Sequence, residues 1–567
     1  MKLARRFLLP GLILGIVCWQ GLPASAASSS TPKTLPAISC GASDVQHALS
    51  QARDGDTVAL PAGTCTYTNT LTITAAINII GSLQGTTIID NVDKSKCGDH
   101  PAIFINIPAN LPWRLSGFTV QGMATDRSSC AEHIKVQTNS HSFRIDHVNF
   151  INLNSGDTGI RIDGDEWGVL DHITMQGDKA RGILIRHTTW QQVGARGDNS
   201  WAQPDTMGTN QAVFVEDSTF NLTNANGHGS VACEQGARCV VRHNTLPFLG
   251  THGTDSTRRT RGMRHEEVYN NVINNQGSNV ANSWLVRSGT GVFFNNSIQP
   301  TARGSYTNPV ALVNYRDFNN YPPYGQATNG YKGACDGTSP WDVNEGTVFE
   351  SGKASGSSGG HDVLTDPTKK WTPNQWVGYS IHNFATGWGS SIIANTDTTI
   401  TTPAQTSSSI HTWSAGDPYQ ILKVYPCLDQ PGRGQGDHLS GGGDAMPPTP
   451  LGWPHEALDP IYAWSNTFGG SAAPVITSKG SHAQANRDFY DWTANFDGTV
   501  GVGSGLLSNR PATCTPLVGY WAIDKDTLYQ CSTKNNWTVH YTPYTYPHPL
   551  QGASTTPPTG LKVTGIH

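Results

Sequence analysis

Long apolar runs, basic clusters and metal-binding cysteine spacings are missing from most of this 567-residue sequence. Beyond the N-terminus no stretch holds 18 apolar residues in a row, so we expect no later membrane span. No stripe of Lys and Arg indicates nucleic-acid binding, and no CxxC or Cys/His spacing indicates zinc. Charged residues make up only 14% of the chain, whereas glycine occurs 61 times. This composition favours short strands and turns over helices, in a chain long enough for two or more domains.

The N-terminus has the pattern of a secretory signal peptide, residues 1–26. Lys2, Arg5 and Arg6 precede an apolar run over residues 7–17, and Ala24-Ser25-Ala26 offers a cleavage site for signal peptidase. Without these three basic residues, 34 Lys and Arg face 42 Asp and Glu, a formal net charge of −8. We therefore expect a secreted, periplasmic or extracellular protein, a monomer with no membrane or nucleic-acid partner.

Ten cysteines remain after cleavage, and an even count in an exported chain indicates disulfides. Because the cysteines cluster along the chain, we expect neighbours to pair. The predicted pairs are Cys40 with Cys65, Cys97 with Cys130, Cys233 with Cys239, Cys335 with Cys427, and Cys514 with Cys531.

Short apolar runs of four to six residues, each ended by Gly, Asn or Asp, extend from residue 57 to about residue 320. One strand type recurs as GIRIDG, GILIRH, SVACEQG and SWLVRSG, and a second recurs as FRIDHVNF, GVLDHITM, CVVRHNTL and GVFFNNSI. A degenerate repeat of about 23 to 27 residues is typical of a parallel β-helix, whose inward Ile, Val and Phe form one continuous core. We expect Asn and His at the strand ends to form ladders in the turns: His147, His172, His243, Asn271 and Asn296.

An amphipathic helix precedes these strands, with Val45, Ala48, Leu49 and Ala52 on its apolar side. A helix at the start of stacked strands covers their otherwise open end. The sequence therefore predicts an all-β fold, a right-handed parallel β-helix with an N-terminal cap.

RIDHVNF (144–150) and VLDHITM (169–175) resemble the strand motif of pectate lyases, and GHGS (227–230) resembles the histidine motif of polygalacturonases. The chain is thus similar to the pectate-lyase-like superfamily of right-handed parallel β-helix proteins, over residues 38–320 and again from about residue 457. That resemblance implies the fold. The Arg-x-Pro-x-x-Arg motif of pectate lyases and the catalytic set of polygalacturonases are missing, so neither activity carries over whole.

Two segments differ from the repeat. Residues 345–426 begin near SGKASGSSGG, a flexible linker by composition, and continue as an inserted β module with Trp371, Trp376 and Trp413 as its core. The C-terminal residues are rich in aromatics around Cys514 and Cys531. The predicted division is a β-helix over 38–344, the insertion over 345–426, a return to the helix over 427–497, and a β module over 498–567.

Charged residues close successive strands of the first type. Aligning the repeats gives one outward column, in which the rung between Glu234 and Arg287 falls most simply on Arg261, with Arg259 and Arg264 as alternatives and Asn314 as the next rung. The column consists of Asp163, Arg186, Glu234, Arg261 and Arg287. Read as a charge ladder, it stabilises the stacked coils by at most about 1 kcal/mol a pair.

Read as a binding groove, the column fits an acidic polysaccharide, because arginine binds carboxylates in bidentate geometry. Neighbouring loops add Trp190, Trp201 and His228. We expect Asp163, Arg186, Arg287, Trp190 and Trp201 to bind substrate, Arg261 or Arg264 to act as base, His228 to relay a proton, and Glu234 to orient an arginine.

The first hypothesis is therefore a polysaccharide lyase that cleaves a uronate polymer by β-elimination, with no certain cofactor and Ca²⁺ as one way to neutralise the carboxylate. A glycoside hydrolase is the alternative, because Asp163 and Glu234 lie two coils apart and hydrolysis needs two carboxylates. A non-catalytic glycan-binding adhesin is the third hypothesis.

Overall fold

The structure is a computed structural model that describes most of the chain after residue 30. The described residues are 31–82, 84–93, 100–122, 131–154, 156–187, 205–223, 229–250, 262–274, 283–299, 309–313, 348–358, 363–377, 379–386, 388–402, 411–422, 431–436, 456–479 and 483–552. The predicted signal peptide and Cys97, Cys130, Cys335 and Cys427 lie outside these ranges.

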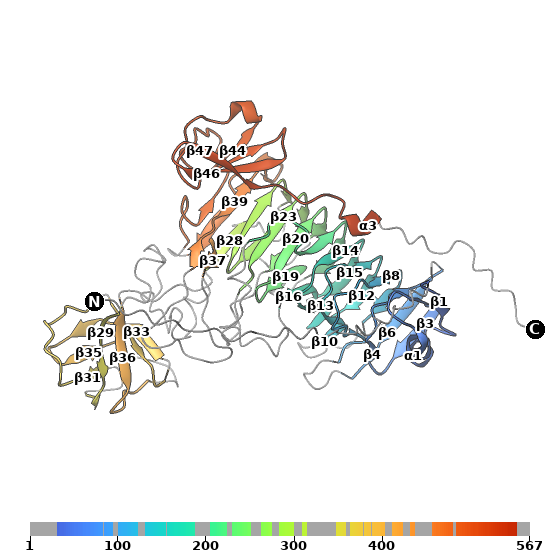
Figure 1. Ribbon diagram of the computed structural model, residues 1–567, viewed down its shortest axis with the longest axis horizontal. Coiled ribbons are helices and arrows are strands. Elements are labelled where there is room, and N and C mark those ends of the chain that lie inside the picture. Colours follow the sequence, from blue (N-terminus) through green and yellow to red (C-terminus); the bar gives the residue numbers. More distant parts are fainter. Residues whose placement is uncertain are drawn as a thin grey trace, which may run out of the picture.

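Three long parallel sheets form a parallel β-helix, because each coil contributes one strand to each sheet (Figure 1). Sheet A contains β1 (Thr34–Pro36), β2 (Thr57–Ala59), β5 (Asn78–Ile80), β8 (Arg114–Ser116), β11 (Phe143–Asp146), β14 (Gly168–Asp171), β17 (Val213–Glu216), β20 (Arg238–Arg242), β23 (His265–Tyr269), β26 (Thr290–Phe294), β39 (Ile461–Trp464) and β43 (Phe489–Tyr490). Sheet B contains β3 (Gly63–Tyr67), β6 (Thr86–Asp90), β9 (Thr119–Gln121), β12 (Asn149–Leu153), β15 (Thr174–Asp178), β18 (Thr219–Thr223), β21 (Thr245–Leu246), β24 (Val272–Asn274), β27 (Ser297–Gln299), β40 (Thr467–Phe468) and the antiparallel β41 (Ser471–Ala472). Sheet C contains β4 (Leu71–Ile73), β7 (Ile103–Ile105), β10 (Ala131–Thr138), β13 (Asp157–Gly164), β16 (Arg181–Arg186), β19 (Val231–Glu234), β22 (Leu249–Gly250), β25 (Trp284–Val286), β28 (Val310–Val313) and β42 (Ile476–Lys479). The predicted β-helix is confirmed.

The interior of the helix is a continuous apolar core, as the alternation of the strands predicts. Helix α1 (Ala42–Gln51) covers one end through buried Val45 and Ala48. A carboxyl group lies in the core: Glu266 stands in the same inward column as Cys239 and accepts a hydrogen bond from Trp284 Nε1 at 2.5 Å. The described disulfides are Cys40–Cys65, Cys233–Cys239 and Cys514–Cys531, three of the five predicted pairs.

Each repeat of the second type holds two strands joined by one residue in the left-handed region, with φ from +49° to +58°. These turn residues are His147, His172, Asp217, His243, Asn270, Asn295 and Ser465. The following position carries a buried ladder of Asn244, Asn271, Asn296 and Asn466, in which each amide donates to the next. The predicted ladders are therefore present. They hold the coils in register because each side-chain amide satisfies the buried hydrogen-bonding groups of the next one.

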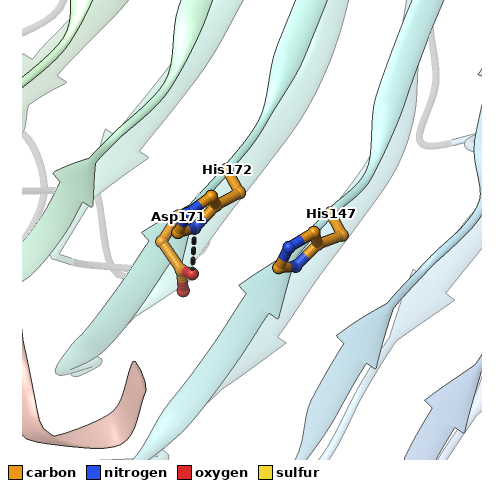
Figure 2. Close-up of side chains that lie close together, drawn as sticks. All are labelled: His147, Asp171 and His172. Atoms are coloured by element: carbon orange, nitrogen blue, oxygen red, sulfur yellow. Dashed lines mark hydrogen bonds and ion pairs between the residues drawn. The ribbon is translucent and has the colours of Figure 1, made fainter. Parts of the chain in front are cut away.

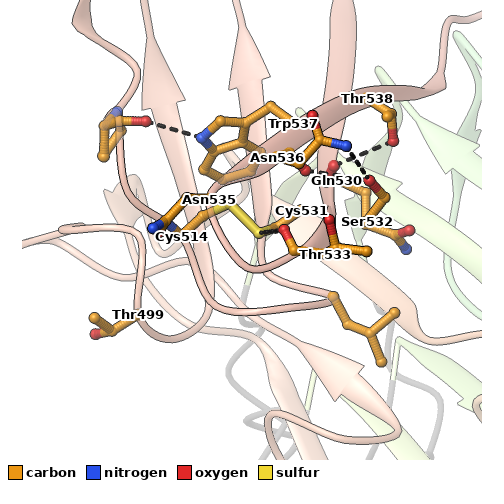
Figure 3. The surroundings of a disulfide bond; sticks show 12 residues. Thr499, Cys514, Gln530, Cys531, Ser532, Thr533, Asn535, Asn536, Trp537 and Thr538 are labelled. Atoms are coloured by element: carbon orange, nitrogen blue, oxygen red, sulfur yellow. Dashed lines mark hydrogen bonds between the residues drawn. A yellow bond between two sulfur atoms is a disulfide. The ribbon is translucent and has the colours of Figure 1, made fainter.

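The outer face of sheet A packs against a C-terminal module. This module is a four-stranded sheet of β44 (Val502–Gly505), β45 (Gly519–Ala522), β46 (Thr527–Thr533) and β47 (Asn536–Tyr541), with a 3₁₀ turn at Leu507–Asn509. Phe294 and Trp464 of the helix share one apolar cluster with Trp521 of the module. Figure 3 shows the disulfide that joins Cys514 to Cys531 of β46. Nearby, Trp537 Nε1 donates to the Pro511 carbonyl at 2.8 Å.

Residues 543–552, including α3 (Pro549–Gly552), run back from this module along sheet A, where Figure 1 shows α3 beside β14. We call them the C-terminal strap. Arg242 donates to Glu216, to the Tyr269 hydroxyl and to the carbonyls of Tyr544 and Thr545. The strap therefore covers charged groups that would otherwise face water.

The insertion forms a separate apolar core around Trp371, Trp376 and Trp413, as predicted. One sheet contains β29 (Val348–Lys353), β36 (Pro418–Leu422), β32 (Ser380–Asn383) and β33 (Trp388–Ser391), and the other contains β30 (Gly356–Ser357), β31 (Val363–Thr365), β35 (Thr399–Thr401) and β34 (Ala394–Asn395). The linker predicted at residues 351–360 is wrong over its described part, because β29 and β30 pair there through backbone hydrogen bonds that need no particular side chains. Residues 359 and 360 lie outside the described ranges. A further hairpin, β37 (Arg433–Gly436) and β38 (Glu456–Leu458), precedes the return to sheet A. Among the described residues no helix is long and apolar enough to cross a bilayer.

Candidate functional site at the corner between sheets C and A

Charged side chains concentrate where the chain passes from a sheet C strand to the next sheet A strand, which we call the C–A corner. The long connections after β16, β22 and β28 all leave the β-helix at this corner, and the connection after β28 contains the insertion. Loops carried by a rigid scaffold are the usual place for binding and catalytic residues.

The register of the predicted column is correct for its first three members. Asp163 pairs with Arg186, and Arg186 pairs with Glu234 on the next coil. The predicted next rung, Arg261, is wrong. The coil between β19 and β25 contributes β22 (Leu249–Gly250) to sheet C, and Arg261 does not belong to that strand. Arg264 instead precedes β23 in sheet A, and Arg261 lies outside the described residues.

The column is also less exposed than predicted. Asp163 and Glu234 are buried, at 1% and 4% exposure, although both occupy outward-facing positions of their strands. Arg161 Nε contacts Asp163 at 2.7 Å, and Arg186 contacts Glu234 at 3.0 Å. These contacts fit the charge-ladder interpretation of this part of the column. Arg287, two coils beyond Glu234, is half-buried, whereas Trp190, Trp201, His228 and Asn314 lie outside the described residues.

Four other residues of the C–A corner form a tighter group, the corner cluster: Asp205, Arg264, His265 and Asp459. Arg264 Nη1 donates to Asp459 Oδ2 at 3.1 Å, and His265 Nδ1 lies 2.6 Å from Asp205 Oδ1. The Arg264 and His265 side chains are fully buried. The Asp205 and Asp459 side chains keep 22% and 15% exposure. The two carboxyl groups are thus the members that solvent or a ligand can reach.

Glycines let the backbone approach this cluster. Gly432 N–H donates to the Gly289 carbonyl at 2.8 Å, and the Gly432 carbonyl accepts from Asp459 N–H at 3.0 Å. A Cβ on Gly434 would lie 2.1 Å from the Asp459 carboxylate and 2.6 Å from Arg264 Nη1. β37 therefore holds the pair from the side, with no room for a larger residue.

The two carboxyl groups of the cluster titrate in opposite directions. Burial and the nearby charge of Asp205 raise the pKa of Asp459 to about 6, against the opposing effect of Arg264. Burial would also raise the pKa of Asp205, but His265, Arg264 and Arg238 outweigh it, and this pKa lies well below its usual range. Near pH 6 one carboxyl group is half-protonated while the other is ionised.

Burial lowers the pKa of His265, against the opposing effect of its hydrogen bond to Asp205. The Nδ1–H donates to the Asp205 carboxylate. Glu267 lies two residues further along β23, with its Oε1 4.0 Å from His265 Nε2. Its carboxylate accepts hydrogen bonds from Gly208 N–H and from the Tyr541 hydroxyl. Burial raises the pKa of Glu267 to about 7. The C-terminal module thus supports the corner cluster through Tyr541.

The sequence analysis missed Asp205, His265 and Asp459. One signal was available: His265-Glu266-Glu267 places three ionisable residues inside a strand whose next rung is Thr290-Gly291-Val292. Three consecutive ionisable residues in a strand of buried repeats are not explained by apolar packing, so they indicate a position with another role. Asp459 had no comparable signal, because the insertion separates it from its partners in sequence.

A possible metal position lies elsewhere, on the turns after β11 and β14. Figure 2 shows His147 and His172 side by side, their rings 4.7 Å apart and nearly parallel, with Asp171 beside His172. Each Nδ1 contacts a carboxylate of its own turn at 2.8 Å, Asp146 or Asp171, which leaves the two Nε2 atoms as ligands. Calcium prefers six to eight oxygen ligands, so this group does not fit the Ca²⁺ considered from the sequence.

Comparisons with known proteins give partial structural similarity. An alginate lyase from Paenibacillus sp. str. FPU-7 aligns over 49% of this chain and 90% of its own, with 15% identity and a TM-score of 0.22. The Dettilon tailspike protein aligns over 67% and 89%, with 11% identity and a TM-score of 0.27. The catalytic domain of a GH87 alpha-1,3-glucanase in complex with nigerose aligns over 52% and 62%, with 12% identity and a TM-score of 0.18. No protein-family model and no curated protein matches the sequence. Because these TM-scores are low, the fold and site rest on the strand register and side-chain contacts above.

Proposed function

We propose that the protein is a glycoside hydrolase acting on a polysaccharide at the C–A corner, with Asp459 as general acid and Asp205 as the ionised carboxylate. The observation that carries this proposal is the opposite pKa shift of two partly exposed carboxyl groups in one cluster. Glycoside hydrolysis commonly uses such a pair: the protonated member donates to the leaving oxygen, and the ionised member activates water or attacks the sugar.

The buried Arg264 and His265 fit the role of residues that position the two carboxyl groups. His265 fixes the orientation of Asp205 through Nδ1, and Arg264 holds Asp459 through Nη1. Arg264 Nε and Nη2 have no acceptor among the described residues, although the side chain is fully buried. A buried donor without a partner costs about 1 to 3 kcal/mol. Because Arg264 is fully buried, a bound sugar would contact the partly exposed carboxyl groups and not this guanidinium.

Elimination from a uronate polymer, the first hypothesis from sequence, is the second candidate. Its support is the Arg186–Glu234 pair and the half-buried Arg287 at the same corner, where guanidinium groups would neutralise a substrate carboxylate. Arg264 does not suit the role of base, because it is fully buried and bonded to Asp459. Hydrolysis needs no exposed arginine and accounts for both corner carboxyl groups.

Products released from a panel of neutral and acidic polysaccharides separate the candidates. Hydrolysis releases reducing ends without absorbance near 235 nm, whereas elimination gives both. We expect Asp205→Asn and Asp459→Asn each to lower kcat at least 100-fold while thermal unfolding stays cooperative. Asp397→Asn, at an exposed position of the insertion, is the matched control. Wild-type kcat in either cluster variant would refute the assignment.

A further inference from the structure

A second cavity lies on the opposite edge of sheet A, between the helix, the C-terminal module and the C-terminal strap. Its volume is about 490 Å³, within the range of about 300 to 1,000 Å³ typical of small-molecule sites. Tyr269, Phe294 and Trp464 line it from the helix, Trp521 and Ile523 from the module, and Tyr546 from the strap. All three parts of the molecule therefore contribute to one pocket.

The helix wall of this pocket is a stack of aromatic rings on successive coils. The rings of Tyr269 and Phe294 lie 4.5 Å apart, and those of Phe294 and Trp464 lie 4.4 Å apart. Trp521 packs against the stack at 39° to Phe294. Because these rings are held by one another, the wall is rigid and formed in advance of any ligand.

The polar groups of the pocket favour an uncharged ligand. Arg242 is its one lining arginine, and all five of its N–H groups already have acceptors in Glu216, Tyr269 and the strap. Asn270, Asn295 and Ser465 add amide and hydroxyl groups from the turns, and Asp526 adds a carboxylate. These groups suit hydroxyls, whereas an anionic ligand would meet Asp526 without a free cation.

We propose that this pocket is a second carbohydrate-binding site that takes one or two neutral sugar units. The inference rests on the proposed function for the kind of polymer, and it separates binding here from cleavage at the C–A corner. The exposed side chains of Ile523 and Tyr546 would contact the sugar, while the turn amides bind its hydroxyls. Such a site holds a polymer on the enzyme between cleavage events.

The test uses the full chain carrying Asp205→Asn and Asp459→Asn, so that bound oligosaccharide is not cleaved. Isothermal titration with neutral gluco-, xylo- and manno-oligosaccharides should find binding by at least one of them. In that background, Ile523→Arg places a large side chain at the rim, where Ile523 is 52% exposed. We expect it to weaken binding at this pocket at least tenfold. Ile393→Arg is the matched control, since Ile393 of the insertion is also 52% exposed.

Thermal melting of each variant reports whether its fold is intact, and we expect Asp397→Asn to have no effect on binding. The inference is refuted if no neutral oligosaccharide binds, or if Ile523→Arg and Ile393→Arg bind equally well. Pocket binding without polymer cleavage by the wild type would refute only the proposed function. Cleavage with unchanged binding by the Ile523 variant would refute only the second site.

Discussion

Asp459 is a residue whose protonation state depends on everything packed around it. Its raised pKa comes first from burial and then from the negative charge of Asp205, and Arg264 only moderates it. A carboxyl group acts as general acid only while protonated, so its contribution is complete below its pKa and lost as pH rises through it.

The pH dependence of kcat/KM tests this assignment. Because the pKa of Asp459 is about 6, we expect activity to fall about tenfold for each pH unit above about 6. Asp459→Asn should remove this alkaline limb together with most activity, and Asp397→Asn should keep it. An alkaline limb centred above pH 8 would show that another group is the acid.

Single asparagines fix the coil register, and Asn271 is the best placed for a stability test. Its Nδ2 donates to the carbonyls of Val241 and Tyr269 and to Asn296, and its Oδ1 accepts from Asn244. Asn271→Ala leaves several buried groups without partners, so we expect a loss on the order of 3 kcal/mol in the free energy of unfolding. Denaturant unfolding measures it, with the exposed Asn149→Ala as a control that should change stability by less than about 0.5 kcal/mol.

At the scale of elements, the C-terminal strap is held by groups that titrate. Burial, and the positive charges of Arg242 and Arg144, lower the pKa of His548 to about 4. His548 Nδ1 accepts from the Leu550 backbone N–H, and the His548 backbone N–H donates to Glu216 Oε2. A neutral His548 therefore belongs to the docked strap.

A histidine with a lowered folded pKa stabilises the fold above its unfolded value of about 6.5, and that stability is lost as pH falls toward 4. We expect this loss to reach on the order of 3 kcal/mol. His548→Gln should reduce the slope of melting temperature against pH between 6.5 and 4, whereas the exposed His47→Gln should leave it unchanged. Equal slopes in both variants would mean that the strap does not depend on this histidine.

The elements themselves were largely predictable from sequence, because a two-residue alternation and a 25-residue repeat are local patterns. The capping helix, the asparagine ladder and the apolar inner columns follow from them. The rung at β22 was not predictable: Leu249-Gly250 is two residues long, and the charged run at Arg261 and Arg264 fitted the spacing better. The corner cluster depends on contacts such as Arg264 with Asp459, 195 residues apart, which no local pattern encodes.

For the whole molecule, the two added modules should behave differently on heating. The insertion has a core of its own, whereas the C-terminal module shares its apolar cluster with sheet A. Calorimetry should therefore show one transition for helix and C-terminal module together, unaffected when residues 348–422 are replaced by a short Gly/Ser linker. Replacing Cys514 and Cys531 by serine opens a link of 17 residues and should lower that shared transition by about 3 kcal/mol in stability. A shift confined to a separate, smaller transition would show that the module unfolds alone.

The asparagine ladder also has a consequence for synthesis on the ribosome. Asn271 and Asn296 are 25 residues apart in sequence, but Asn296 and Asn466 are 170 apart. The longer closure costs only about 1.7 kcal/mol more in chain entropy. In time the difference is larger, since 170 residues take roughly 8 to 34 s to translate. Earlier coils can stack as they emerge, whereas the edge of β26 and the ring of Phe294 must wait uncovered for β39 and the module. This nascent intermediate, with an open strand edge beside an aromatic surface, is the stage at which the chain is most exposed to aggregation and most in need of a chaperone.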